Sequence, residues 1–309
     1  MIPVLLRRDR VFRRYWMAQT VSLFGDQITT LALPLTAVLL LHSTAAQMGY
    51  LTAAVWLPYL LFSLLVGAWV DRSGRRRRAM IIADVGRALL LGTVPLLALL
   101  HALSIYQLYA VAFAAGVLSV VFSVSQQSLF QALVHRERLI EGTSLVNGSR
   151  AFSLAAGPSL AGLLTQVFSA PVAILGDCVS FVASAVLLGS INPAEPPSSR
   201  NEPHGLSGGA RFIRHSRVVG PALACTATIN LFNFAFSALY VLFAVRQLGV
   251  SPGTLGLVLG TGAMGSIVGS LFTSRIARRI GVGPAYIAGC VLFTVPLILV
   301  PLAGGASWV

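Results

Sequence analysis

Residues 67–78 read Gly-Ala-Trp-Val-Asp-Arg-Ser-Gly-Arg-Arg-Arg-Arg, and they lie between two long apolar segments. Five arginines fall within the last seven of these residues. Loops on the cytoplasmic side of a membrane are enriched in Lys and Arg. The stretch therefore predicts a short cytoplasmic loop between two membrane-spanning helices.

The composition supports this reading. Hydrophobic residues make up 56% of the 309, charged residues only 10%, and the mean hydropathy is +0.82, whereas about a quarter of the residues of a soluble domain are charged. We therefore expect an all-α integral membrane protein. The net charge of +13 does not indicate nucleic-acid binding, because every basic residue is Arg and most lie between apolar segments. Three isolated cysteines with no paired spacing give no indication of a disulfide framework, a metal site or a cofactor.

A helix needs about 20 apolar residues to cross a bilayer. The sequence contains about nine such segments: 15–41, 47–70, 79–101, 105–131, 139–167, 171–190, 218–245, 252–274 and 284–303. Nearly all arginines outside these segments fall in alternate gaps, beginning with the N-terminal tail. This asymmetry predicts a multi-pass protein of the inner (cytoplasmic) membrane with a cytoplasmic N-terminus.

The gap at 191–217 differs from the others because it is long and rich in Pro and Ser. We interpret it as a cytoplasmic linker between a six-helix bundle, 1–190, and a partial bundle of about three helices, 218–309. An internal repeat crosses this linker. Asp71-Arg72-x-x-Arg75-Arg76 follows the second segment, and Ser274-Arg275-x-x-Arg278-Arg279 follows the eighth. This placement is expected for two parallel repeats.

The chain resembles the major facilitator superfamily of transporters, most of all the bacterial drug-efflux branch that includes macrolide and siderophore exporters. The resemblance rests on Gly67, Asp71, Arg72, Gly74, Arg75 and Arg76 between helices two and three, on Gly25-Asp26 in helix one, on Gly157, Pro158 and Gly162 in helix five, and on the long linker. It implies twelve helices in two bundles of six, with the first set of residues forming a cytoplasmic gate against helix eleven. The sequence ends after about nine helices, so the resemblance also implies that the second bundle is truncated.

Ionisable residues inside the predicted helices are the candidates for a functional role, because a charge at the centre of a membrane helix costs roughly 2.5–3.5 kcal/mol and normally faces a cavity or a partner. Asp26 lies near the predicted midplane and is the best candidate for a carboxylate that exchanges protons; the alternative is a structural carboxylate paired permanently with an arginine. Arg87, Arg150 and Asp177 are further internal charges. Asp84 and Arg87 are three residues apart and can satisfy each other.

Amide side chains mark a candidate substrate cavity. Gln126 and Gln127 lie on the fourth predicted helix, and Asn230 and Asn233 on the seventh. Each can contact a substrate or form a hydrogen bond between helices, and both readings stay open. Small residues recur every four positions around Gly157, which favours close helix packing.

No arrangement of nucleophile and base is apparent, and the absence of Lys excludes a Walker A loop in this sequence. These absences argue against an enzyme and against a transporter that itself hydrolyses ATP, and the resemblance implies a secondary transporter, which we expect to be monomeric. It would export a hydrophobic or amphiphilic small molecule, such as a macrolide-like drug, by alternating access and in exchange for protons. Its partners would be the bilayer, the substrate and protons, with no nucleic acid. The alternative is a non-transporting membrane module or an inactive truncated remnant.

Overall fold

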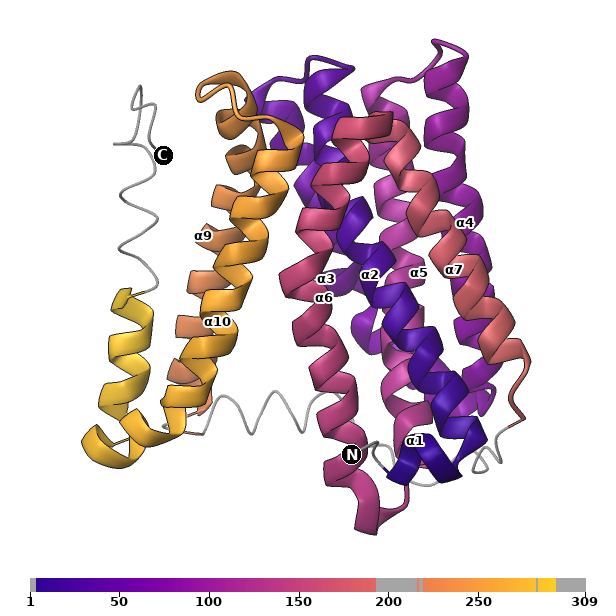
Figure 1. Ribbon diagram of the computed structural model, residues 1–309, viewed down its shortest axis with the longest axis vertical. Helices are drawn as coiled ribbons and strands as arrows, with labels where there is room; N and C mark the ends of the chain where they lie inside the picture. Colours follow the sequence, from indigo (N-terminus) through magenta and orange to yellow (C-terminus); the bar gives the residue numbers. More distant parts are fainter. Residues whose placement is uncertain (1–3, 193–215, 217–218, 282, 293–309) are drawn as a thin grey trace.

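The structure is a computed structural model that describes residues 4–192, 216, 219–281 and 283–292, in which all regular elements are helices (Figure 1). Some side chains within these ranges, among them that of Asp71, are not described. Most of the predicted linker and the latter part of the last predicted span, 293–303, lie outside the described residues.

The helices follow the predicted segments closely. They are α1 (Val4–Arg8), α2 (Arg10–Leu39), α3 (Ala45–Ser73), α4 (Arg76–Leu99), α5 (Ile105–Leu133), α6 (Leu139–Phe168), α7 (Ala170–Gly189), α9 (Val219–Arg246) and α10 (Pro252–Ile280). A one-turn helix, η1 (Arg136–Arg138), precedes α6, and a short apolar helix, Gly283–Leu292, follows α10. Among the described helices, seven are long and apolar enough to cross a membrane, namely α2 to α7 and α9. The eighth predicted segment forms α10.

Helices α2 to α7 pack into one bundle (Figure 1). Helix α2 contacts α6 and α7, α3 contacts α5, and α4 contacts both α5 and α7. Large apolar side chains such as Leu35, Leu108 and Ile174 fill the interior, while Leu60, Leu89 and Val179 are exposed on the outside. This pattern suits a hydrocarbon solvent, in which helices satisfy their own backbone hydrogen bonds and apolar residues cover the outer surface.

Local sequence signals fix where the membrane helices begin and end. The Asp9 side chain accepts hydrogen bonds from the backbone N–H groups of Val11 and Phe12 at the start of α2. Thr44 and Gln47 form a capping box at the start of α3. Gly74 ends α3 in the left-handed conformation, with φ of 61°, which glycine adopts without a Cβ penalty. Helix α4 begins two residues later, so residues 74–75 reverse the chain tightly.

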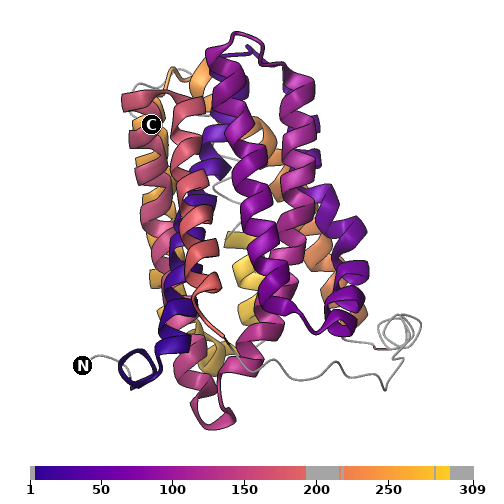
Figure 2. The same ribbon diagram turned by 90° about the vertical axis from the view of Figure 1, so that its right-hand side faces the viewer.

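The N-terminus, the α3–α4 turn and η1 lie at one end of the bundle, which we call the arginine-rich end (Figures 1 and 2). Two arginines there bind the last carbonyl groups of the α7 end. Arg14 Nη1 donates to the carbonyl oxygen of Ser190 at 2.7 Å, and Arg77 donates to that of Ile191. Cations are favourable at a helix C-terminus, where carbonyl groups lack helical partners. The end of α7, where the chain leaves the bundle, is thereby fixed to α2 and α4.

Helices α9 and α10 pack against the bundle at α3 and α6, respectively. The crossing of α6 and α10 is very close, because a Cβ atom added at Gly256 would lie 2.3 Å from the carbonyl oxygen of Pro158. A Cβ atom at Gly162 would lie 2.5 Å from the carbonyl oxygen of Pro252. Between α3 and α9, the rings of Trp56 and Phe234 pack with centroids 4.5 Å apart. Small residues on α6 therefore serve helix packing, as the sequence indicated.

Candidate functional site

Two cavities that share lining residues enter the bundle. The deeper cavity has a volume of about 270 Å³ and is lined by residues of all six helices from α2 to α7. The outer cavity has a volume of about 760 Å³ and lies between α2, α5 and α6 towards the arginine-rich end. Ser123, Gln126 and Arg150 line both cavities. The two cavities are therefore neighbours, the outer one towards the arginine-rich end and the deeper one towards the middle of the bundle.

A cluster of charges surrounds Arg87 at the deeper cavity. Arg87 Nη2 binds Asp84 Oδ1 one turn earlier on α4, and Nη1 lies 3.4 Å from Asp26 Oδ1 on α2. The guanidinium carbon also lies 4.5 Å from the ring centroid of Phe122 and 4.0 Å from that of Phe181. A desolvated guanidinium is attracted to aromatic faces. Two rings and two carboxylates thus hold Arg87 in place.

The three carboxylates of this region differ in their access to the cavity. The Asp26 side chain is 42% exposed, whereas that of Asp84 is 0% exposed. Asp177 on α7 is also buried, and its two carboxylate oxygens accept hydrogen bonds from Thr29 at 2.5 Å and from Ser180 at 2.9 Å. Asp26 is therefore the carboxylate of this cluster that a proton or a solute in the cavity can reach most readily.

Gly25, next to Asp26, allows α2 and α7 to pack closely. A Cβ atom at Gly25 would lie 1.9 Å from Ser180 Oγ and 2.2 Å from Asp177 Oδ1. Any side chain larger than hydrogen would therefore force α7 away from α2 or force the side chains of Ser180 and Asp177 to rotate. The adjacent Gly25 and Asp26 combine a close helix contact with a carboxylate on the cavity side.

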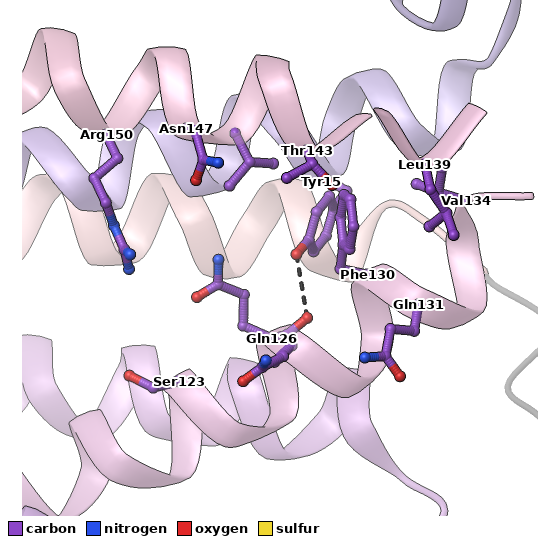
Figure 3. A pocket seen from close by; sticks show the side chains of 12 residues that line it. Tyr15, Ser123, Gln126, Phe130, Gln131, Val134, Leu139, Thr143, Asn147 and Arg150 are labelled. Atoms are coloured by element: carbon purple, nitrogen blue, oxygen red, sulfur yellow. Dashed lines mark hydrogen bonds between the residues drawn. The ribbon is translucent and has the colours of Figure 1, made fainter. Parts of the chain in front are cut away.

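Arg150 on α6 has a different environment from Arg87. Its side chain is exposed, and it makes no hydrogen bond or ion pair with any of the described residues. Figure 3 shows Arg150 and Asn147 extending from one helix towards the helix that carries Ser123 and Gln126. Tyr15 closes part of the wall by donating a hydrogen bond of 3.2 Å to the backbone carbonyl oxygen of Gln126.

The predicted amide residues divide into two groups. Gln126 and Gln127 line the outer cavity, and Gln126 also lines the deeper one. Asn230, in contrast, is exposed and donates to the carbonyl oxygen of Thr226 in its own helix at 2.9 Å. Neither Asn230 nor the half-buried Asn233 lines the two cavities.

The predicted gate residues lie at the arginine-rich end, where Gly67 is on α3 and Arg76 begins α4. Arg72 and Arg75 are exposed. A Cβ atom at Gly67 would meet nothing within 4 Å. The side chain of Asp71 is not described, so the gate assignment stays a prediction.

The predicted helix-five motif lies on α6 and contacts two other helices. A Cβ atom at Gly157 would lie 2.5 Å from Gln27 Cβ on α2, Pro158 stands within the helix, and Gly162 faces α10.

Sequence reasoning missed several cavity residues, among them Gln19 and Ser22. Both are buried and line the deeper cavity. Neither Gln19 Nε2 nor Ser22 Oγ has a hydrogen-bond partner among the described residues. The available signal was the helical spacing of Gln19, Ser22 and Asp26, which follow one another at intervals of three and four residues. Within the described part of the chain, no group of His, Cys, Asp and Glu side chains could hold a metal ion.

Comparisons with known proteins agree with this architecture. YfiS, an MFS-type transporter of Bacillus subtilis, is 23% identical over 288 residues, which cover 89% of this chain and 66% of YfiS. Tap, a multidrug efflux pump of Mycobacterium tuberculosis, is 24% identical over 290 residues, which cover 87% of this chain and 67% of Tap. The chain thus spans about two thirds of the length of these curated relatives.

A solved structure shares the fold. The crystal structure of a bacterial homologue of the human lysosomal transporter Spinster, inward-facing and unoccupied, matches with a TM-score of 0.69 at 13% identity. The match covers 87% of this chain and 62% of the other. A family model for the Major Facilitator Superfamily matches residues 15–309. The chain therefore belongs to the Major Facilitator Superfamily, a family of membrane transporters and not of enzymes.

Proposed function

We propose that the protein carrying this chain is a secondary transporter that exports hydrophobic or amphiphilic small molecules in exchange for protons. Family membership and the similarity to multidrug efflux pumps support the transport class. In this proposal residues 1–190 form the first bundle, 191–217 the linker and 218–309 part of the second bundle. The arginine-rich end faces the cytoplasm, because positive charge is retained on that side. The cavities then open towards the cytoplasm, where an exporter loads.

The observation that carries the proton assignment is the placement of Asp26. It is half-exposed in the cavity, yet it lies 3.4 Å from a buried arginine. Asp26 and Asp84 share Arg87 as their counter-charge, and Asp177, which lines the same cavity as Asp26, forms no ion pair with any of the described residues. Uncompensated charge is costly in this environment. We infer that protons supply the balance and that Asp26 is where they exchange.

The geometry also favours exchange over a permanent ion pair. When Asp26 takes up a proton, Arg87 keeps its bond to Asp84 and its contacts with Phe122 and Phe181. Neutralising Asp26 therefore does not leave a lone buried cation, which would otherwise oppose protonation. Because α2 packs against both α6 and α7, a change at Asp26 can alter the packing of helices that line the cavity. Rocking of the two bundles, with the residues from Gly67 to Arg76 as the cytoplasmic gate, would complete alternating access.

The test is dye export by protein reconstituted in vesicles, with and without a pH gradient. We expect Asp26→Asn to lose the component of flux that the pH gradient drives, because the amide cannot exchange a proton. Glu137→Gln is the matched control, since Glu137 is an exposed carboxylate on η1 outside the cluster. Export at the full gradient-driven rate by Asp26→Asn would contradict the assignment.

A further inference from the structure

Three hydrogen-bond donors without partners line the deeper cavity. Gln19 is 2% exposed and Ser22 is 1% exposed, and neither Gln19 Nε2 nor Ser22 Oγ has a hydrogen-bond partner among the described residues. Arg150 adds a guanidinium that no described residue binds. Buried polar groups normally have partners, because leaving them without one costs free energy. The buried Gln19 and Ser22 are therefore suited to a ligand that supplies acceptors, and Arg150 adds an exposed charge that can bind the same ligand.

The charges around the cavities separate Arg150 from Arg87. Arg87 is held by two carboxylates and two aromatic rings. Arg150 lines both cavities, and none of the residues that line the outer cavity is acidic. Figure 3 shows its side chain reaching across the outer cavity, with amide groups as its polar neighbours. The charge that the outer cavity offers to a solute is therefore positive.

Part of the remaining surface of the deeper cavity is apolar, although polar side chains such as Asp26, Thr29 and Asp177 also line it. Trp56, Leu91 and Phe181 line it together with the three donors. A ligand that satisfies this cavity needs an apolar body and an acceptor-rich head. Asp26 also lines the deeper cavity, but its carboxylate shares Arg87 at 3.4 Å, whereas no described residue binds Arg150.

We propose that the exported molecule is an anionic amphiphile whose carboxylate, or a similar oxyanion, binds Arg150 with Gln19 and Ser22 as additional donors. This inference rests on the proposed function, because it takes the two cavities as the loading site. The oxyanion would accept two parallel hydrogen bonds from the guanidinium, a geometry that lysine cannot provide. The apolar part of the ligand would lie against Trp56, Leu91 and Phe181.

The test measures equilibrium binding of three matched probes to the protein in nanodiscs of zwitterionic lipid, with empty nanodiscs subtracted. The probes are 11-(dansylamino)undecanoate, its uncharged methyl ester and the amine of the same chain length. We expect the carboxylate to bind about 10- to 100-fold more tightly than the ester, the range of a hydrogen-bonded charge. Arg150→Gln should abolish this preference, and Arg150→Lys should keep part of it.

Arg246→Gln is the matched control, because Arg246 is exposed at the end of α9 and lines neither cavity. It should bind all three probes as the parent protein does. Equal binding of carboxylate and ester by the parent protein, or a preference that survives in Arg150→Gln, overturns the proposal. Binding needs no pH gradient, so Asp26→Asn should keep the preference. A failure of the anion preference is thereby distinguishable from a failure of proton-coupled export.

Discussion

Replacing Gly25 by alanine tests the close contact on which the charge cluster depends. The added Cβ would lie 1.9 Å from Ser180 Oγ, about 1.5 Å short of ordinary contact, and 2.2 Å from Asp177 Oδ1. Both obstacles are on α7, so α2 and α7 must separate or the two side chains must rotate. Inserting a methyl group into a packed interior typically costs about 1–3 kcal/mol. We expect Gly25→Ala to fall in that range, and to disturb the hydrogen bond between Asp177 and Thr29.

The assay is thermal unfolding of the purified protein, together with dye export in vesicles. Gly49→Ala is the control, because it also lies within a membrane helix but a Cβ there meets nothing within 4 Å. It should be neutral or slightly stabilising, since alanine favours helix over glycine by up to about 1 kcal/mol. Removing the hydroxyl in Gly25→Ala/Ser180→Ala should restore only part of the stability, because the obstacle at Asp177 stays. Equal stability and activity of Gly25→Ala and the parent protein would refute the reasoning.

Three further substitutions probe other contacts of the fold. Arg87→Leu leaves Asp84 buried without its partner and should cost about 3–5 kcal/mol in unfolding free energy, while Arg87→Leu/Asp84→Leu should recover part of that loss. Gly256→Ala should widen the crossing of α6 and α10, because its Cβ would lie 2.3 Å from a carbonyl oxygen of α6, and spin-label distances between the two helices should increase. Gly74→Ala should lower stability by about 1 kcal/mol, since φ is 61° there, and an unchanged melting temperature would contradict the left-handed turn.

The sequence predicted the helices well, because the length of an apolar run is set by the bilayer and is readable without tertiary information. It also predicted the pairing of Asp84 with Arg87, since three residues on a helix define neighbours. The approach of Arg87 to Asp26, 61 positions away, was not predictable in this way. Helical spacing shows which side chains share a face, and it does not show which helix that face contacts.

The same limit explains the amide residues. Gln126 and Asn230 looked alike in sequence, yet one lines both cavities and the other bonds to its own helix. Gln19 and Ser22 passed unnoticed because a buried polar residue without a partner is recognisable only when its surroundings are known. Small residues around Gly157 indicated close packing correctly, although the partners, α2 and α10, came only from the structure.

The central claim, that Asp26 is where protons exchange, is tested most directly by proton release in weakly buffered detergent solution. A pH-sensitive dye reports protons released when an exported solute is added to purified, protonated protein. The account predicts release of about one proton per protein, none in Asp26→Asn, and an unchanged signal in the control Glu137→Gln. Release of the same amount by Asp26→Asn would contradict it and would move proton exchange to another group.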